Sequence, residues 1–215
     1  MNLNNIDIPS KLFITGIDTD AGKSFVTGYV AKALLDAGKS VITQKFIQTG
    51  NNDFSEDIEV HRKIMEIPYT PEDESGLTAP VIFTYPASPD LAARIDKKDL
   101  DFTLIEEASE KLSDKYEYLL IEGAGGLMVP LKDEYLTIDY IKELDLPVLF
   151  VTNGRLGSIN HTLLSLYSIK NYGIKLFGVV YNSFFDKDKI ICDDTKGYIK
   201  KWLNNRFPDS VYLEI

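Results

Sequence analysis

The feature that most constrains the fold is the run Gly16–Ser24, which reads Gly-Ile-Asp-Thr-Asp-Ala-Gly-Lys-Ser. It follows the apolar residues Leu12–Ile14 and precedes a helical pattern. In such a strand–loop–helix unit, backbone N–H groups and the helix N-terminus point at a phosphate, the lysine adds a positive charge, and the serine hydroxyl can bind Mg²⁺. Ile17 stands where the standard pattern has its first glycine, and Gly16 lies one position early. The run still predicts a nucleotide-phosphate loop rather than an ordinary turn.

Apolar segments and helical patterns alternate along the chain. The predicted strands are short and rich in Val, Ile, Leu or Phe, as strands covered on both faces are; they are Lys11–Thr15, Ser40–Phe46, Tyr118–Ile121, Pro147–Thr152, Leu176–Tyr181 and Val211–Ile215. The predicted helices are Lys23–Ala37, Glu56–Ile67, Phe102–Ser113, Ile138–Leu144, Ile159–Asn171 and Thr195–Arg206. Gly38 and Gly173 follow two of them, where a left-handed C-cap is expected. This alternation predicts an α/β fold with a doubly wound, mostly parallel sheet of about six to seven strands, helices on both faces, and ligands beyond the carboxyl ends of the strands.

Composition narrows the class of protein. The 215 residues suit one domain spanning 1–215, and the formal charge of −10 argues against non-specific binding of nucleic acid. The single cysteine, Cys192, excludes an internal disulfide and fits a reducing compartment. The sequence shows no leader pattern and no apolar stretch long enough to cross a bilayer. We therefore expect a cytoplasmic enzyme with neither a membrane nor a nucleic-acid partner.

The least regular segment is Pro68–Pro89, which contains five prolines. It can be a long surface connection, but loops of this length in compact domains are often functional. The sequence leaves both interpretations open.

Lys45 ends the second predicted strand, in the run Gln44-Lys45-Phe46-Ile47-Gln48-Thr49-Gly50. Alone, it reads as a solvated residue at a strand end. If its strand lies next to the phosphate-loop strand, the ammonium extends over the phosphates, and phosphoryl transfer is catalysed mainly by positioned positive charge. Thr49 and Gly50 then offer a hydroxyl and a close backbone approach to a second ligand.

Two acidic residues follow at predicted element ends. Asp57 lies in the first turn of a helix, where the helix dipole alone explains an acid, but Mg²⁺ on the loop serine needs further oxygen ligands. Glu122 ends an apolar strand and precedes the glycines of Gly123–Gly126. A strand-end glutamate can be solvated or cap a helix, yet beside these glycines it is typical of a metal-binding carboxylate.

Two polar loops follow later strands. Asn153–Asn160 opens a helix and is either an anion site made from backbone N–H groups or a helix cap. Asn182 and Ser183 either contact a nucleotide base or form a turn. His61 and His161 lie in helical patterns without Cys or His at ligand spacing, so we interpret them as core or surface residues.

Together these motifs resemble those of the dethiobiotin synthetases. The resemblance is carried, in order along nearly the whole chain, by Thr15–Ser24, Lys45, Thr49-Gly50, Asp57, Ala87-Ser88-Pro89, Glu122–Gly126, Val129-Pro130-Leu131, Leu156–His161 and Asn182. It implies a phosphate-loop ATPase fold and the ATP- and Mg²⁺-dependent closure of the dethiobiotin ring from 7,8-diaminopelargonic acid and CO₂. It also implies a homodimer with the substrate site at the interface.

The resemblance assigns a role to each matching residue. Lys45 is implied as the catalytic lysine, and Ser24, Asp57 and Glu122 as the Mg²⁺ ligands. Nucleotide contacts are implied for Thr19, Asp20, Ala21, Gly22, Lys23, Ser24, Phe25, Asp57, Glu122, Gly123, Ala124, Gly125, Asn182 and Ser183. Substrate contacts are implied for Thr49 and for Leu156, Gly157, Ser158, Ile159 and Asn160, the last five reaching the diamine's carboxylate in the partner subunit.

Three departures from the family pattern stand out. Phe46 replaces the proline that usually follows the lysine, which is expected to loosen the strand end without abolishing the chemistry. Ser183 stands where an acid often follows the asparagine, and the sequence ends at Ile215 where many relatives continue into a base-contacting loop. Nucleotide base selectivity is therefore left open.

Two other classes carry similar phosphate loops. The amidation domain of cobyrinate-type synthases is accompanied by a glutaminase domain, for which 215 residues leave no room. Partitioning ATPases, which switch partners, typically have a second lysine early in the loop, and Gly16–Asp20 contains none. A GTP switch is disfavoured because the sequence has no Asn-Lys-x-Asp motif.

Overall fold

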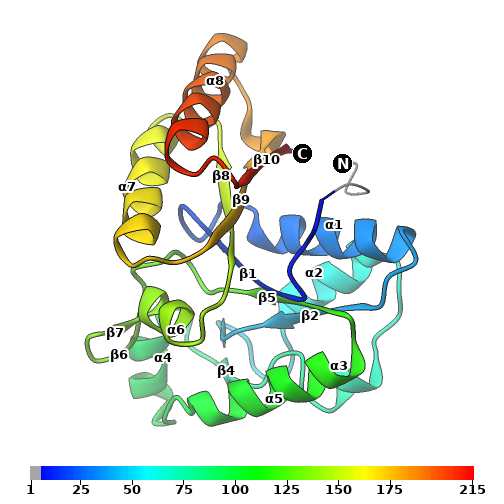
Figure 1. Cartoon of the computed structure of the whole chain (residues 1–215). Helices are drawn as coiled ribbons and strands as arrows, with labels where there is room; N and C mark the ends of the chain where they lie inside the picture. Colours follow the sequence, from blue (N-terminus) through cyan, green and yellow to red (C-terminus); the bar gives the residue numbers. More distant parts are fainter. Residues whose placement is uncertain (1–5) are drawn as a thin grey trace.

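Six parallel strands form the central sheet of this computed structural model, which describes residues 6–215 (Figure 1). They are β1 (Lys11–Gly16), β2 (Val41–Lys45), β5 (Tyr118–Glu122), β8 (Val148–Asn153), β9 (Leu176–Asn182) and β10 (Val211–Glu214). Their order is β10-β9-β8-β1-β5-β2, and every neighbouring pair is parallel. Because parallel neighbours are joined by crossovers, the carboxyl ends of all six strands meet at one edge.

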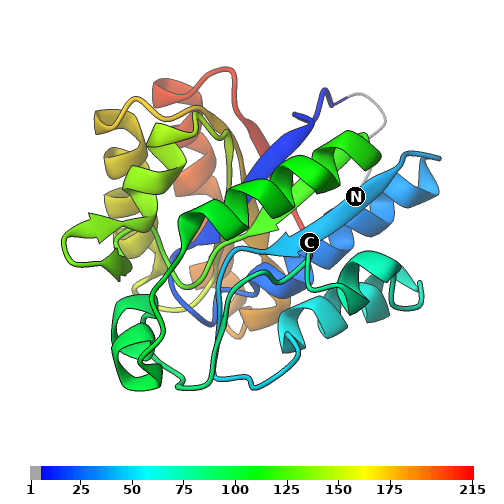
Figure 2. The same ribbon diagram turned by 90° about the horizontal axis from the view of Figure 1, so that it is seen from below.

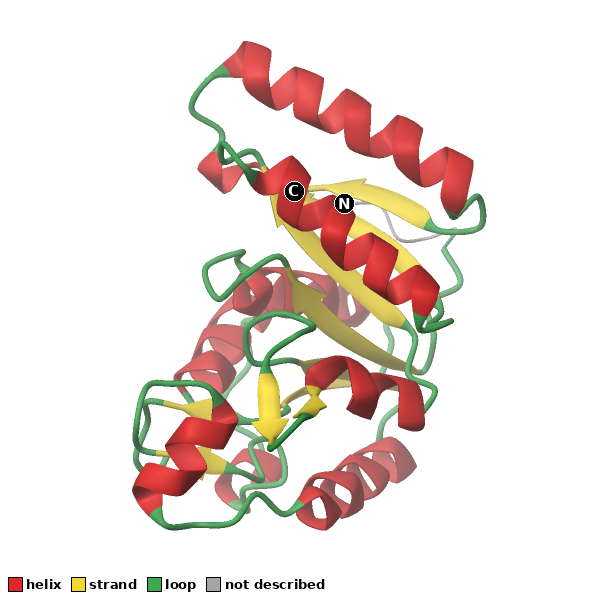
Figure 3. Ribbon diagram, turned by 90° about the vertical axis from the view of Figure 1, so that its left-hand side faces the viewer, coloured by secondary structure: helices red, strands yellow, loops and turns green. Residues whose placement is uncertain are grey.

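Helices cover both faces of this sheet (Figure 3). They are α1 (Lys23–Asp36), α2 (Glu56–Met65), α5 (Phe102–Lys115), α6 (Thr137–Glu143), α7 (Ser158–Asn171) and α8 (Lys189–Arg206). Apolar side chains of α1 and α2 form one core with alternate residues of the strands, and those of α5, α6, α7 and α8 form the other. Figure 2 shows α5, in green, lying over the sheet and running roughly along the direction of the strands. Across residues 6–215, none of the helices is both long and apolar enough to span a bilayer.

The predicted doubly wound fold is confirmed, and each of the six predicted strands and helices exists. Gly38 and Gly173 both have positive φ, at 76° and 64°, as expected just after a helix. The main boundary error is α8, which begins at Lys189 rather than Thr195. The side chain of Asp188 accepts hydrogen bonds from the N–H groups of Ile190 and Ile191 and so caps the earlier start.

Several short elements were not predicted; all but the eight-residue α4 have only two to four residues, too few to show a periodicity. They are α3 (Pro71–Glu74), α4 (Pro89–Asp96), a 3₁₀ turn (Ser183–Phe185), and two strand pairs, β3 (Gln48–Thr49) with β4 (Ile82–Phe83) and β6 (Pro130–Lys132) with β7 (Tyr135–Leu136). The segment Pro68–Pro89 is therefore not a featureless connection. Its helix α3 is held by a buried ion pair between Asp73 and Arg62 of α2.

The position of Lys45 differs from the prediction in one respect. Its strand, β2, does not lie next to the phosphate-loop strand β1, because β5 lies between them. In the register of the sheet, Glu122 of β5 pairs with Lys45 on one side and with Ile14 on the other. Lys45 therefore reaches the loop across the end of β5, where Glu122 stands.

Candidate active site

The phosphate loop connects β1 to α1, as the sequence predicts. Gly22 is the N-cap of α1 and has a φ of 90°, which side-chain-bearing residues rarely adopt. A Cβ atom there would also lie 2.1 Å from Nδ2 of Asn182. Asn182 donates from that nitrogen to the Ala21 carbonyl at 3.2 Å, so the end of β9 supports the loop directly.

Lys23 lies folded against the loop. Its side chain is buried, and Nζ donates to the carbonyl oxygens of Asp18 at 2.7 Å and Thr19 at 3.3 Å. Burial, followed by repulsion from Lys45, lowers the pKa of Lys23 from 10.5 to about 8. An anionic ligand would relieve both effects, because it returns an opposite charge to a desolvated ammonium.

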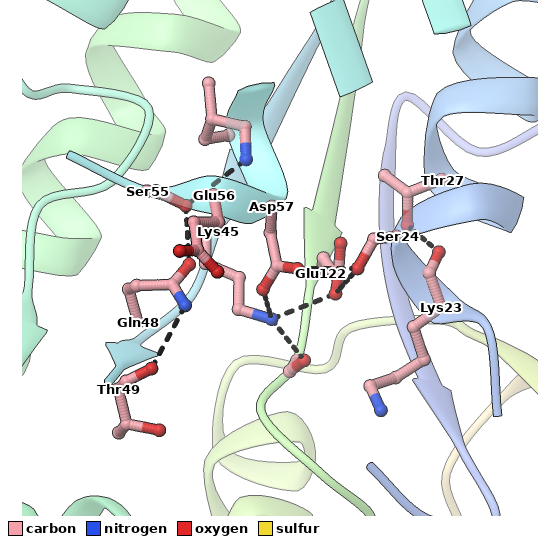
Figure 4. A network of polar contacts seen from close by, with 12 residues as sticks. Lys23, Ser24, Thr27, Lys45, Gln48, Thr49, Ser55, Glu56, Asp57 and Glu122 are labelled. Atoms are coloured by element: carbon pink, nitrogen blue, oxygen red, sulfur yellow. Dashed lines mark hydrogen bonds and ion pairs between the residues drawn. The ribbon is translucent and has the colours of Figure 1, made fainter. Parts of the chain in front are cut away.

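Three side chains with oxygen atoms that can bind a metal ion converge beside the loop. The Ser24 hydroxyl lies 2.7 Å from Oδ1 of Asp57 and 2.9 Å from Oε1 of Glu122. They come from α1, α2 and β5, and Figure 4 shows them facing one another. One hydroxyl and two carboxylates are hard oxygen ligands, so this donor set fits Mg²⁺, which takes its remaining ligands from phosphate and water.

Lys45 points into the same cluster rather than into solvent (Figure 4). Its Nζ atom lies 2.5 Å from Oδ2 of Asp57, 2.9 Å from Oε1 of Glu122 and 3.2 Å from the Gly123 carbonyl. Burial lowers the pKa of Lys45, but the carboxylates of Glu122 and Asp57 outweigh burial and raise it. Lys45 is therefore charged at neutral pH.

Glu122 is ionised despite complete burial. Burial raises the pKa of its carboxyl group, but the Lys45 charge and the hydrogen bond from His61 outweigh burial and hold the pKa far below its usual range. Asp57 is placed by the start of α2, where the Ser55 side chain caps Ile58 N and donates to Oε1 of Gln48 at 2.6 Å. Glu122 is thus available as a charged ligand.

The expected loosening of the strand end at Phe46 is wrong. The Phe46 N–H donates to the Glu122 carbonyl at 2.9 Å, a bond that proline does not make. The fully buried ring packs edge-on against Phe13, with 5.5 Å between centroids, and against Tyr140. Phe46 therefore ties the end of β2 to β5.

A cavity of about 630 Å³ opens over these groups. Nine of the residues to which the resemblance assigns a binding or catalytic role line it: Thr19, Lys23, Ser24, Lys45, Thr49, Asp57, Glu122, Ala124 and Gly125. The opposite wall is made by Pro86–Pro89, the end of the proline-rich segment, and by Met128–Pro130. The phosphate loop and the two acids thus face the same cavity. Thr49 and Pro86–Pro89, for which the sequence left a ligand-facing role open, face it as well.

Other predicted residues lie outside that cavity. Asp20 is exposed, Ala21 is buried, and Phe25 is 45% exposed and stacks on Tyr29. Gly123 contributes its carbonyl to Lys45. Ser183 begins the 3₁₀ turn after β9, where its hydroxyl donates to the Ile215 carbonyl.

The residues of Leu156–Asn160 are not brought into the cavity of their own chain. Leu156, Gly157 and Ile159 line a separate hollow of about 320 Å³ between α7 and the start of α8, and Leu156 is 89% exposed. Arg155, just before them, forms an ion pair with Asp18 of the phosphate loop. This ion pair connects the segment before Leu156 to the phosphate loop of the same chain.

His61 is a core residue, as interpreted from the sequence, but its contact with Glu122 was not predicted. The histidine is fully buried, and its Nε2 atom lies 2.6 Å from Oε2 of Glu122. It follows Asp57 by four residues on α2, so the two side chains lie on one face of the helix. That spacing from a candidate metal ligand was the available signal, whereas a search for His and Cys at ligand spacing passes over it.

A doubly wound sheet with a phosphate loop after β1 and an acid at the end of β5 defines the class of P-loop nucleotide-binding proteins. The family model described as "AAA domain" matches residues 10–204. The chain belongs to the dethiobiotin synthetase family. It is 45% identical to the ATP-dependent dethiobiotin synthetase BioD 2 of Pasteurella multocida, over 93% of this chain and 94% of the relative. The BioD 2 of Haemophilus influenzae is 49% identical, over 84% and 94%, and the BioD of Chlorobaculum tepidum 44%, over 87% and 79%.

Solved structures support the fold. The structure of pNOB8 ParA aligns with 97% of this chain and 81% of its own, at 14% identity and a TM-score of 0.56. The signal recognition particle receptor FtsY from Elizabethkingia anophelis aligns with 96% of this chain and 58% of its own, at 13% identity and a TM-score of 0.52. At these identities the likeness concerns the fold alone.

Proposed function

We propose that this protein carboxylates 7,8-diaminopelargonic acid with CO₂ and closes the ring to dethiobiotin, converting ATP to ADP and phosphate. The observation that carries the proposal is the convergence of Lys23, Ser24, Lys45, Asp57 and Glu122 on one cavity, in a chain that is 45% identical to a dethiobiotin synthetase over nearly its full length.

ATP is proposed to bind with its phosphates over the loop at the N-terminus of α1. Thr19–Phe25 surround the phosphates, and Lys23 moves from the loop carbonyls to the β- and γ-phosphates. Glu122–Gly125 border the phosphates from β5, while Asn182 and Ser183 lie towards the base. The support is the position of each residue around the loop.

Mg²⁺ is proposed to bind to Ser24, Asp57 and Glu122, whose oxygens already lie within hydrogen-bond distance of one another. Bound there with ATP, Mg²⁺ would neutralise charge on the phosphate oxygens. The Lys45 ammonium now lies between the two acids, so its side chain would turn towards the cavity when the metal binds.

The chemistry requires two anions to meet. One amine of the substrate attacks CO₂ and loses a proton, giving a carbamate. A carbamate oxygen attacks the γ-phosphorus, the bond to ADP breaks, and a carbamic–phosphoric anhydride forms. The second amine attacks the carbonyl carbon, loses a proton and expels phosphate, which closes the ring. Lys23 and Lys45 supply the positive charge that stabilises the transferring oxygens.

The substrate site is proposed to lie between two copies of the chain. Thr49 lines the cavity beside Lys45 and offers a hydroxyl to the diamine. The exposed Leu156, with Gly157, Ser158, Ile159 and Asn160, would meet the diamine's carboxylate in the partner's cavity, since these residues lie outside their own. We further propose that residues 1–215 act as one domain, in the cytoplasm.

The proposal is tested with purified protein, diaminopelargonate, bicarbonate and Mg·ATP, with dethiobiotin detected by mass spectrometry. We expect dethiobiotin and one ADP per ring closed, with ATP hydrolysis dependent on the diamine. ATP hydrolysis at the same rate without diamine, and no dethiobiotin, would support a switch ATPase instead.

Lys45→Ala tests the catalytic assignment. We expect turnover to fall by at least about 10²- to 10³-fold, the usual cost of removing one donor that stabilises transition-state charge. Lys111→Ala is the matched control, because Lys111 lies exposed on α5 and pairs only weakly with Glu107 at 3.9 Å. Circular dichroism checks the fold, and a folded Lys45→Ala protein with near-normal turnover contradicts the assignment.

A further inference from the structure

A chain of hydrogen bonds runs behind Glu122. Its Oε2 atom lies 2.6 Å from Nε2 of His61, and Nδ1 of His61 lies 3.0 Å from the Thr43 hydroxyl. Arg62 donates to the same hydroxyl at 2.8 Å and pairs through two nitrogens with Asp73. All five side chains are buried, and of the five only Glu122 lines the cavity.

The chemistry of these groups sets the direction of each hydrogen bond. A guanidinium only donates, so the Thr43 oxygen accepts from Arg62 and its own hydrogen is free for Nδ1 of His61. A neutral ring whose Nδ1 accepts carries its proton on Nε2, the atom that faces Glu122. The Glu122 carboxylate, whose other oxygen accepts from Ser24 and Lys45, accepts in turn from Nε2–H of His61.

The two oxygens of Glu122 have separate tasks. Oε1 meets Ser24 and Lys45, each at 2.9 Å, at the edge of the cavity. Oε2 is held by His61 on the buried side. We propose that His61 is a positioning residue, which fixes the orientation of the Glu122 carboxylate so that Oε1 faces Ser24 and the cavity. The inference rests on the metal-binding role proposed for Glu122.

The same two elements, β2 and α2, carry both the residues that face the cavity and the residues behind Glu122. β2 carries Lys45 and, two residues earlier on the same face, Thr43. α2 carries Asp57 and, one turn later, His61. β2 thus contributes one side chain to the cavity cluster and one to the row behind it, and α2 contributes one to the cluster and two to the row, His61 and Arg62. Arg62, anchored by Asp73, holds the far end of that row.

The experiment compares His61→Leu, which removes the donor, with His61→Gln, whose amide N–H can replace Nε2–H. Calorimetry measures the affinity for ADP with and without Mg²⁺, and the result is the ratio of the two affinities. The control is Ser109→Ala, which removes a buried 2.7 Å hydrogen bond to Gln44 on the other face of β2.

We expect His61→Leu to weaken Mg·ADP binding about 10- to 100-fold more than metal-free ADP binding, as is usual when the partner of a ligating carboxylate is lost. His61→Gln should restore most of the ratio of ADP affinities with and without Mg²⁺. Ser109→Ala should lower thermal stability but leave that ratio unchanged. A folded His61→Leu protein with the wild-type ratio overturns the inference.

Two further measurements separate the positioning role of His61 from the metal-binding role of Glu122 and cover the case in which His61→Leu does not fold. Glu122→Gln with an unchanged ratio would refute the metal role itself, whereas a loss in Glu122→Gln but not in His61→Leu would refute only the positioning role. If His61→Leu does not fold, ¹⁵N NMR of labelled histidine in the wild-type protein gives the tautomer directly, since the chain has only two histidines. A neutral His61 protonated on Nδ1 would overturn the proposal.

Discussion

Two buried carboxylates, Asp73 and Glu122, stand at opposite ends of one row of hydrogen bonds and are used differently. Asp73 accepts from Arg62 through both oxygens, at 2.7 and 2.8 Å, from the N–H and hydroxyl of Thr70, and from the hydroxyl of Thr78. Glu122 accepts from His61 on one oxygen and shares the other between Ser24 and Lys45 at the wall of a cavity.

The difference lies in what surrounds each charge. For both carboxyl groups burial raises the pKa and the neighbouring cations outweigh it, so that both pKa values are lowered. The partners of Asp73 are all protein groups, which makes it part of the framework. Those of Glu122 include a lysine and a serine that also line the cavity, so a ligand can replace them. Burial and charge alone therefore do not distinguish a functional acid from a structural one.

The largest effect is expected for Asp73→Asn. Removing one partner of a buried ion pair leaves Arg62 without its counter-charge and should cost about 3 to 5 kcal/mol of unfolding free energy. Urea denaturation measures the loss, with the exposed Asp53→Asn as control. Turnover per folded molecule should fall less than in Glu122→Gln, because Asp73 reaches Glu122 only through the row of Arg62, Thr43 and His61. A loss below about 1 kcal/mol would mean that the pair is not a framework element.

Glu122→Gln should show the opposite pattern. We expect turnover to fall about 10²- to 10³-fold, because a charged group at the reacting phosphates is lost. The unfolding free energy should change less than in Asp73→Asn, since Lys45 keeps Asp57 and the Gly123 carbonyl. Steady-state kinetics and urea denaturation measure the two effects, with Glu110→Gln, at an exposed position of α5, as control. If Glu122→Gln lost more unfolding free energy than Asp73→Asn while keeping its turnover, Glu122 would be a structural acid like Asp73.

Thr78→Val tests how far the Asp73 site depends on complete hydrogen bonding. The Thr78 hydroxyl is buried and donates to Oδ1 of Asp73 at 2.6 Å. Its loss should cost about 1.5 to 3 kcal/mol, the usual value for a bond to a charged group. Thr84→Val is the matched control, because Thr84 makes the same kind of bond to Asp96 at an exposed position. Equal losses in the two variants would argue against a role of burial.

The smallest effect concerns pH and contrasts Lys23 with Arg62, which stays charged at all working pH values. The pKa of Lys23 is lowered from 10.5 to about 8 in the unliganded protein. The cost of burying its charge is therefore present below pH 8 and is relieved as the pH rises towards 10.5, so this group's contribution to stability increases across that window.

Nucleotide affinity should change in the reverse direction, because the phosphates need the charged amine. From pH 7 to pH 9 we expect metal-free ADP to bind up to about tenfold more weakly, with proton uptake on binding near pH 8. Calorimetry in two buffers of different ionisation enthalpy measures both quantities. Lys23→Met should bind weakly without this pH dependence. Proton uptake of equal size in Lys23→Met would assign it to another group.

Much of the fold could be predicted from short runs of the sequence. The run Gly16–Ser24 predicts the loop because its geometry depends on neighbouring residues, and the alternation of apolar segments predicts the six strands and six helices that are present. The short pair β3–β4 and helix α3 were not predicted, because each is stabilised from outside its own residues: β3 pairs with β4 much later in the sequence, and Asp73 of α3 pairs with Arg62 of α2.

The sequence determined which chemical groups are present and at which strand and helix ends they stand: Lys23, Ser24, Lys45, Asp57 and Glu122 were all found in this way. Only the tertiary structure decided the strand order, which puts β5 between β1 and β2, and so made Glu122 the centre to which Lys45, Ser24 and His61 all bond. Strand order depends on the sum of many packing contacts between distant segments, which no local run of residues encodes.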